Sequence, residues 1–108
     1  MENSTQFGSV ITPCFNEQDN IAAFYAALTG VPGISDVIGE IIFVDDGSTD
    51  NTYEVVRSLA EKDHRVKCLR FSRNFGSHAA LSAGLRRASG AFAVILSADL
   101  QDPPELIP

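Results

Sequence analysis

Apolar residues follow two alternating patterns along this chain. Four short runs are rich in Val, Ile, Leu and Phe, which is typical of strands. These runs cover residues 9–12, 40–44, 66–71 and 91–96. Between them, apolar residues recur every three or four positions, as in Ile21, Phe24 and Leu28, which indicates helices with one buried face. The pattern predicts the order β-α-β-α-β-α-β, a Rossmann-like three-layer α/β/α fold with a mainly parallel sheet.

Small polar residues and glycines mark the expected ends of the three helices. Asn16 or Asp19 can cap the first helix, and Asp50 is a candidate cap for the second. Ser77 is the candidate cap of the third helix, and Gly90 fits the left-handed position that follows a helix. We therefore expect the first helix to begin soon after residue 16 or 19, and the other two soon after residues 50 and 77.

Two further expectations concern the strands and the last helix. Pro13 should end the first strand. The run at 91–96 is apolar throughout, as expected of a strand covered by helices on both faces. The third helix should turn four residues inward, namely Leu81, Gly84, Leu85 and Ala88.

Composition narrows the class of protein. The 108 residues, 44% of them hydrophobic, suffice for one compact domain. A net charge of -6 argues against a nucleic-acid surface, which would need clustered Lys and Arg. Cys14 and Cys68 are expected to be ordinary core thiols in a reducing compartment. The first residues lack a signal-peptide pattern, and no apolar run approaches the ~20 residues of a membrane span, so we expect a cytoplasmic chain.

Two of the apolar runs lead directly into oxygen-bearing side chains. Asp45 and Asp46 follow the run at 40–44, and Asp99 and Gln101 come soon after the run at 91–96. Open parallel sheets bind ligands outside the carboxyl ends of their strands. Carboxylate and amide oxygens suit a hard divalent cation and the phosphates that it carries. We therefore expect a metal-bound nucleotide at this edge, with Asp45 and Asp46 pointing to opposite faces.

Four segments of the chain resemble one known family. They are residues 13–17 (PCFNE), residues 44–50 (VDDGSTD), residues 73–84 (RNFG followed by AL and AG), and residues 98–105 (ADLQDPPE). In this order they resemble the family-2 glycosyltransferases of the GT-A fold, most of all the polyprenyl-phosphate sugar transferases. The resemblance spans nearly the whole chain. It implies that residues 1–108 are the nucleotide-sugar-binding part of a truncated GT-A domain whose acceptor part is absent.

The resemblance also implies which side chains meet the ligand. The nucleotide-binding residues would be Pro13, Phe15, Glu17, Asp46, Arg73, Ser97, Ala98 and Asp99. A divalent cation, Mg²⁺ or Mn²⁺, would be held by Asp99 and Gln101. Ser97 stands where the family's Asp-x-Asp metal motif has its first acid, which removes one charge from the site while leaving a hydroxyl that can hydrogen-bond.

Several of these residues also have a purely structural interpretation. Glu17 could accept a hydrogen bond from a ribose or base, or could be a solvated acid in the first turn of a helix. Asp50 is interpreted as structural, because turn and helix-cap chemistry alone would select it. Arg70 and Lys67 are interpreted as surface charges. His78 is interpreted as an exposed helix residue.

The implied reaction is inverting transfer of a sugar from a UDP- or GDP-sugar to a polyprenyl phosphate or a glycan. Any catalytic base would lie beyond Pro108, so no catalytic residue is expected in this chain. A full-length parent would be membrane-associated on the cytoplasmic face, and an uncovered sheet edge would let the fragment self-associate. The alternatives are a non-catalytic nucleotide-binding module and a receiver-like or flavodoxin-like domain. The latter lacks support, since the first loop has no glycine and the third strand has no acceptor Asp.

Overall fold

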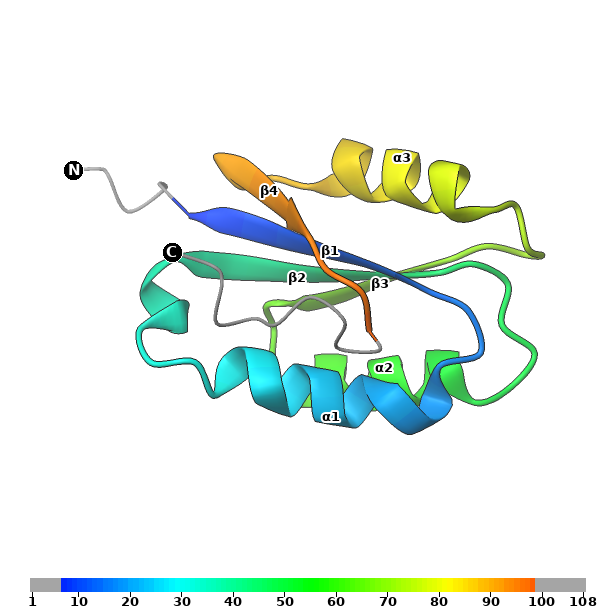
Figure 1. Ribbon diagram of the computed structural model, residues 1–108, viewed down its shortest axis with the longest axis horizontal. Coiled ribbons are helices and arrows are strands. Elements are labelled where there is room, and N and C mark those ends of the chain that lie inside the picture. Colours follow the sequence, from blue (N-terminus) through cyan, green and yellow to red (C-terminus); the bar gives the residue numbers. More distant parts are fainter. Residues whose placement is uncertain (1–6, 99–108) are drawn as a thin grey trace.

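Four parallel strands in the order β3-β2-β1-β4 form the middle layer of the structure, a computed structural model that describes residues 7–98 (Figure 1). The strands are β1 (Gly8–Cys14), β2 (Ile38–Asp45), β3 (Val66–Arg70) and β4 (Phe92–Ile95). The helices are α1 (Gln18–Thr29), α2 (Thr52–Lys62) and α3 (Ser77–Arg87), with a short 3₁₀ helix η2 (Ile34–Asp36). The predicted order of elements and the α/β class are confirmed, and most element ends differ from the prediction by one or two residues.

The helices lie on both faces of the sheet. The chain moves outward from β1 to β2 and β3 through α1 and α2, which pack together on one face. It then crosses back through α3 on the other face to place β4 on the free side of β1. The direction of winding therefore reverses between β1 and β4, which is the point where open α/β sheets bind ligands.

Each face of the sheet has its own apolar core. On the α1 and α2 face, Phe24 and Phe43 meet edge to face at 5.9 Å and are fully buried, each contributing about 1.5–3 kcal/mol through burial. On the other face, α3 lies so close to the sheet that a Cβ at Gly84 would be 2.5 Å from Ile11 Cγ2. The inward position predicted for Gly84 is confirmed.

The β1 strand continues through Pro13 to Cys14, so the predicted stop at Pro13 is wrong. Ile11 O accepts a hydrogen bond from Leu96 N on the β4 side, whereas Cys14 O accepts one from Asp46 N on the β2 side. Successive residues of a strand direct their backbone groups to alternate sides, so the Pro13 nitrogen faces β4. The last pair between β1 and β4 is at Ile11, so no residue of β4 pairs with Pro13. No ladder hydrogen bond is lost, so proline is tolerated there.

The β4 strand and the outer side of α3 are more exposed than predicted. Phe92 is 45% exposed and Ile95 is 47% exposed, because β4 is an edge strand of the described sheet. Leu85 is 51% exposed, so its predicted inward orientation is wrong, and Ala80 and Gly84 form the buried side of α3 instead.

Gly90 also differs from its prediction, since its backbone is not left-handed. A Cβ there would lie 2.8 Å from Gly8 C and 2.8 Å from Phe7 O. Close approach to the start of β1 is therefore the reason for a glycine at this position.

A buried carboxylate holds the amino ends of the strands together. Glu40 on β2 is 1% exposed and accepts hydrogen bonds from Ser9 Oγ at 2.6 Å, Ser89 N at 2.8 Å and Lys67 Nζ at 2.6 Å. Arg87 lies 3.9 Å away. Burial would raise the pKa of Glu40, but the hydrogen bonds from Lys67, Ser89 and Ser9 outweigh it and lower the pKa to about 2. The surface interpretation of Lys67 is therefore corrected, because Lys67 neutralises a buried acid.

Candidate functional site

A small cavity lies at the carboxyl ends of β1 and β2, close to the start of α3. It has a volume of about 190 Å³. Its lining consists of Pro13, Cys14, Phe15, Glu17, Asp46 and Ser77. Four of the predicted nucleotide-binding residues are therefore brought together at one edge of the sheet. The volume is below the roughly 300–1,000 Å³ of a pocket that encloses a whole small molecule, so the cavity suits one part of a larger ligand.

The chemistry of this cavity suits a group that donates hydrogen bonds. Glu17 and Asp46 bring carboxylates to it, and the Phe15 ring is 43% exposed beside them. A carboxylate accepts hydrogen bonds from ring N–H groups and sugar hydroxyls, and an exposed aromatic ring offers a stacking surface. A bare phosphate would be repelled by the same two acids.

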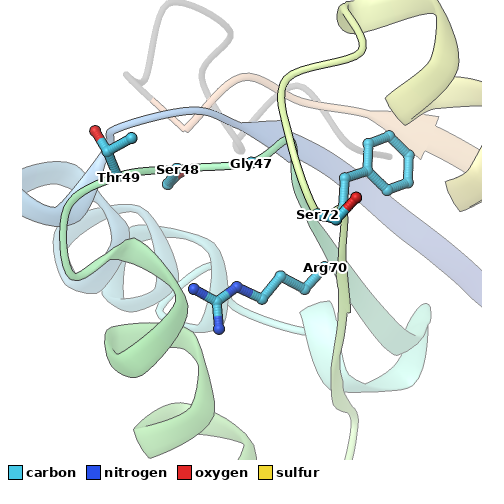
Figure 2. A pocket seen from close by; sticks show the side chains of 6 residues that line it. Gly47, Ser48, Thr49, Arg70 and Ser72 are labelled. Atoms are coloured by element: carbon cyan, nitrogen blue, oxygen red, sulfur yellow. The ribbon is translucent and has the colours of Figure 1, made fainter.

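A larger cavity of about 440 Å³ lies between the loop that follows β2 and the end of β3 (Figure 2). It is lined by Gly47, Ser48, Thr49, Arg70, Phe71 and Ser72. None of the predicted nucleotide-binding residues lines it. Its cation, Arg70, has its guanidinium carbon 4.2 Å from the Tyr53 ring centroid and its Nε 3.8 Å from Asp45 Oδ2. Arg70 is thus a partner of a buried acid, which corrects its interpretation as a plain surface charge.

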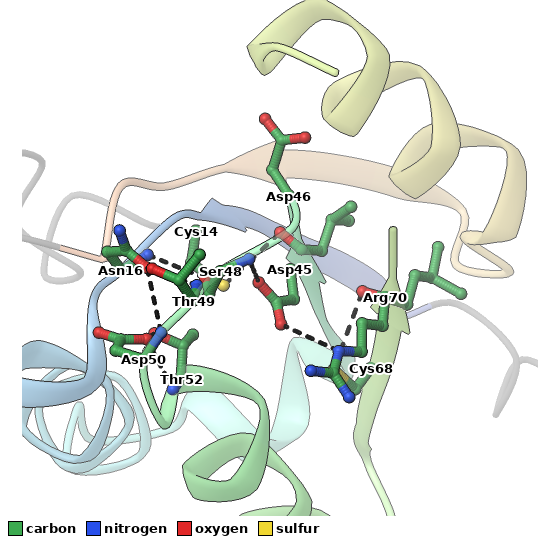
Figure 3. Close-up of polar contacts among 12 residues, drawn as sticks. Cys14, Asn16, Asp45, Asp46, Ser48, Thr49, Asp50, Thr52, Cys68 and Arg70 are labelled. Atoms are coloured by element: carbon green, nitrogen blue, oxygen red, sulfur yellow. Dashed lines mark hydrogen bonds and ion pairs between the residues drawn. The ribbon is translucent and has the colours of Figure 1, made fainter. Parts of the chain in front are cut away.

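The two adjacent aspartates at the carboxyl end of β2 point to opposite faces, as predicted (Figure 3). Asp45 faces the α2 side, is fully buried, and accepts a hydrogen bond from Ser48 N at 2.9 Å. Its Oδ2 has no hydrogen-bond partner among the described residues. Asp46 faces α3 and lines the small cavity, so Asp46 is the acid that can reach a ligand there.

Asp46 also holds the loop that precedes α3. Its carboxylate accepts hydrogen bonds from Phe75 N at 2.8 Å and Gly76 N at 3.0 Å, and from Asn74 Nδ2 at 3.3 Å. These donors lie at the positive end of α3, where a carboxylate is favoured. The loop after β3 is therefore fastened to the loop after β2 beside the cavity.

Arg73 lies outside the small cavity. It is exposed, and its guanidinium carbon is 4.6 Å from the centre of the Phe75 ring. The structure does not bring Arg73 to Glu17 and Asp46 as a lining residue. Its predicted contact with a nucleotide or diphosphate stays a prediction. His78 is exposed, as expected.

The helix starts differ from the predicted caps. The residues that precede α1, α2 and α3 are Glu17, Asn51 and Gly76, and none of them caps its helix with its own side chain. Instead, Asp50 accepts hydrogen bonds from Thr52 N at 2.9 Å and from Gln18 N at 3.3 Å, so one acid serves both α1 and α2. This supports the structural interpretation of Asp50.

Both cysteines are free thiols in the described part of the chain. Cys14 lines the cavity, but burial raises the pKa of its thiol well above the ordinary value. Burial also raises the pKa of Cys68 to about 12. A thiolate is the reactive form of cysteine, so neither residue is a nucleophile here.

The residues after β4 extend this edge of the sheet toward the switch point. Leu96 N donates to Ile11 O at 3.1 Å, so Ser97 and Ala98 follow directly beside the end of β1. Ser97 is half-buried, and Ala98 packs in the core of the α1 and α2 face. Asp99 and Gln101, the predicted metal ligands, lie outside the described residues.

Within residues 7–98, no group of three or more His, Cys, Asp or Glu side chains could hold a metal ion. The oxygens of Asp46 are engaged with backbone and amide donors. The assignment of Asp99 and Gln101 as ligands of a divalent cation stays a prediction. None of the helices between residues 7 and 98 has the length and apolar character needed to cross a bilayer.

Two cavity-lining residues, Cys14 and Ser77, were not among the predicted site residues. Ser77 was interpreted as a helix cap, yet it lines the cavity at the first position of α3. The signal that could have found it is the Asn-Phe-Gly segment at 74–76, whose last residue adopts a left-handed φ of 100° and lets the helix begin at this edge.

The sheet order and the cavity at its carboxyl edge place the chain in the class of three-layer α/β domains that bind ligands at a topological switch point. The model of the glycosyl transferase family 2 matches residues 9–108. The chain belongs to this family.

Relatives with assigned names agree with this membership. A bactoprenol glucosyl transferase of Shigella phage SfV is 42% identical over 100 residues, which cover 93% of this chain and 33% of that protein. An undecaprenyl-phosphate 4-deoxy-4-formamido-L-arabinose transferase of Yersinia pestis is 39% identical over 101 residues, which cover 93% and 31%. The chain thus spans about a third of the length of these relatives.

Solved structures show the same fold, which is that of GT-A glycosyltransferases. The mannosyltransferase PcManGT from Pyrobaculum calidifontis, in complex with GDP-Man and Mn²⁺, has a TM-score of 0.75 and 31% identity, with 85% of this chain and 27% of that chain covered. S. aureus TarS 1-349 in complex with UDP-GlcNAc has a TM-score of 0.76 and 25% identity, with 87% and 27% covered. The predicted Rossmann-like, mainly parallel architecture is confirmed.

Proposed function

We propose that this chain is the nucleotide-sugar-binding part of an inverting glycosyltransferase. The observation that carries the proposal is the convergence of Phe15, Glu17 and Asp46 on one cavity at the carboxyl edge of the sheet. In this proposal the cavity receives the nucleoside of a UDP- or GDP-sugar. Similar proteins are named in complexes with GDP-Man and with UDP-GlcNAc, which supports both base classes.

The acids of the cavity decide how the donor would lie. Glu17 and Asp46 repel the diphosphate and accept hydrogen bonds from the base and ribose. The diphosphate would therefore point away from them, toward Ser97 and the residues that follow β4. This orientation would place the sugar above the switch point between β1 and β4, where an acceptor can approach.

A divalent cation is part of the proposal. Asp99 and Gln101 would hold Mg²⁺ or Mn²⁺, and the complex of a similar mannosyltransferase with Mn²⁺ supports this choice. When bound, the cation would neutralise the diphosphate leaving group. Phe15, Glu17 and Asp46 would bind the nucleoside and so orient the anomeric carbon of the sugar.

The acceptor that we favour is a polyprenyl phosphate, because relatives are named for bactoprenol and undecaprenyl phosphate. A phosphate monoester has a second pKa of about 6 and is mostly ionised at neutral pH, so it can attack without a protein base. A glycan acceptor would need a carboxylate base. The two free cysteines support a reducing, cytoplasmic location, and a membrane-bound acceptor would bring the full-length protein to the cytoplasmic face.

Calorimetry with UDP, GDP and their sugars, with and without Mn²⁺, tests the nucleoside assignment. We expect Asp46→Asn to weaken nucleotide binding at least about tenfold, since it removes a charged acceptor and loosens the loop at Phe75. Asp36→Asn is the matched control, because Asp36 is an exposed acid on η2. Equal affinities for the two variants would contradict the proposal.

The cation assignment has its own test. Asp99→Ala should abolish the Mn²⁺ dependence of nucleotide binding, and Ser97→Asp should strengthen it by restoring the missing acid. If Asp99→Ala binds nucleotide and Mn²⁺ as the wild type does, the cation lies elsewhere.

We do not expect the 108-residue chain to transfer a sugar by itself, because it spans about a third of the length of the transferases to which it is similar.

Phe92 and Ile95 on the edge strand are nearly half exposed, which supports our proposal that a second copy of the chain covers this edge in solution. Sedimentation at increasing concentration would then show a dimer, and a strictly monomeric species would contradict it.

A non-catalytic nucleotide-binding module is the second candidate. Ser97 favours it, because the hydroxyl stands where the resemblance expects an acid. In that case a full-length protein would bind a UDP- or GDP-sugar by calorimetry and transfer no sugar to polyprenyl phosphate.

A further inference from the structure

Asn16 has an unusual backbone for its place in the chain. It follows Phe15 in the loop after β1, and its φ of 53° makes it the one non-glycine residue with a positive φ among residues 7–98. Left-handed backbone costs a typical L-residue roughly 1–2 kcal/mol, and asparagine tolerates it better than most. Asn16 is exposed and does not line the cavity, so packing does not account for it.

The bonds of Asn16 join two loops that are more than thirty residues apart in the sequence (Figure 3). Its Oδ1 accepts hydrogen bonds from Thr49 N at 2.8 Å, Thr49 Oγ1 at 3.3 Å and Asp50 N at 3.4 Å. Its own N–H donates to Ser48 Oγ at 2.8 Å. The backbone and the side chain of Asn16 are therefore both committed to the loop after β2.

This junction adjoins, in both loops, residues that line the cavity. Phe15 and Glu17 are the immediate neighbours of Asn16, and Asp46 comes two residues before Ser48. The left-handed turn at Asn16 sets the directions in which Phe15 and Glu17 leave the loop. The bonds to Ser48 and Thr49 then set the separation of those residues from Asp46.

We propose that Asn16 is a positioning residue for the nucleotide pocket, acting through the two loops that it joins. This inference rests on the proposed function, since the pocket is the one assigned to the nucleoside. Asn16 makes no contact with the ligand in this account. Its effect on affinity comes from holding Phe15, Glu17 and Asp46 in one arrangement before the ligand arrives.

Two substitutions separate the conformation of Asn16 from its side-chain acceptor. Asn16→Gly keeps the left-handed backbone accessible and removes the acceptor. Asn16→Asp keeps the shape of the side chain, the oxygen acceptor and the tolerance of positive φ. Glu40→Gln is the control for stability, because Glu40 lies at the opposite end of the sheet.

Binding of UDP and of GDP, each with Mn²⁺, is measured by calorimetry on the 108-residue chain, together with its melting temperature. We expect Asn16→Gly to weaken binding at least about tenfold and Asn16→Asp to return it to within about threefold of wild type. Glu40→Gln should lower the melting temperature and leave affinity unchanged. Wild-type affinity in Asn16→Gly, or failure of Asn16→Asp to restore it, overturns the inference.

Hydrogen exchange of residues 46–50 distinguishes failure of this inference from failure of the proposed function. If the wild type binds neither nucleotide, the proposed function fails. The hydrogen-exchange rates alone then decide whether Asn16 holds the two loops together. Exchange in Asn16→Gly that is at least about threefold faster, and slowed again in Asn16→Asp, supports the positioning role. Unchanged exchange overturns it.

Discussion

The two ends of the sheet use buried carboxylates in different ways. At the amino end, Glu40 accepts hydrogen bonds from side chains and backbone of β1, β3 and the segment before β4, and both of its oxygens are engaged. At the carboxyl end, Asp46 binds backbone N–H groups of the loop before α3, and Asp45 has an oxygen without a hydrogen-bond partner among the described residues. The first end joins strands, and the second joins loops.

The difference indicates that the amino end of the sheet contributes mainly to stability, whereas the carboxyl end carries the candidate binding site. Asn16, Gly47 and Gly76, three of the four residues with a positive φ among residues 7–98, lie in the loops at the carboxyl end, whereas Gly33 precedes η2. Conformations of this kind persist at functional edges when surrounding contacts enforce them. A change at the amino end should therefore alter stability alone, whereas a change at the carboxyl end should alter stability and nucleotide affinity together.

Gly47→Ala should have the largest effect. Gly47 has a φ of 76°, and a Cβ there would lie 2.2 Å from the Arg73 carbonyl carbon and 2.4 Å from Asn74 N. Neither backbone can move without disturbing the loop that Asp46 holds. We expect a loss of roughly 4 kcal/mol in the free energy of unfolding and no measurable nucleotide binding.

Gly33→Ala is the matched control for that change. Gly33 has a φ of 78°, and a Cβ there would meet no atom within 4 Å. It should lose about 1 kcal/mol in urea unfolding from backbone strain alone and keep its nucleotide affinity. Equal losses in the two variants would mean that strain, and not the close approach of the loops, determines the effect at Gly47.

Acid should weaken the amino end through Glu40. The pKa of Glu40 falls from 4.5 to about 2 on folding, so its contribution is complete above pH 4.5 and is lost as the pH drops toward 2. The shift corresponds to about 3 kcal/mol. Urea unfolding at several pH values should show a stability difference between wild type and Glu40→Gln that shrinks across this window; a constant difference would contradict the assignment.

At neutral pH, Glu40→Gln should cost roughly 2 kcal/mol, because the amide loses the charged hydrogen bond to Lys67. For a domain of this size, that corresponds to a fall in melting temperature of about 8–16 °C. The cost is moderate because the Lys67 side chain is 34% exposed and can turn to water. A loss of nucleotide affinity in this variant would show that the two ends are coupled.

The smallest effect is expected between α1 and the turn that joins α2 to β3. The Tyr25 hydroxyl donates to Asp63 Oδ2 at 2.6 Å, and Arg65 hydrogen-bonds the same carboxylate. Tyr25→Phe removes one hydrogen bond and leaves Arg65 in place, so thermal unfolding should show a loss of about 1 kcal/mol. Unchanged affinity for UDP and GDP is expected, and a binding defect would contradict the division into two ends.

Local patterns in the sequence predicted the elements and the edge that carries the site. Helical spacing at Ile21, Phe24 and Leu28 predicted the buried side of α1, because such spacing reflects burial by whatever layer lies beneath. The acids that follow β2 predicted the polar carboxyl edge. The opposite orientations of Asp45 and Asp46 followed from the geometry of an extended chain.

The tertiary structure alone decided which polar residues hold one another. The partners of Glu40 lie 27 to 49 residues away in the sequence, and Asn16 meets Thr49 across 33 residues. The exposure of β4 likewise depended on the order of the strands in the sheet, and its apolar composition gave no hint of it. Spacing along a chain records which face of an element is buried, whereas hydrogen-bond partners and sheet edges depend on how distant segments come together.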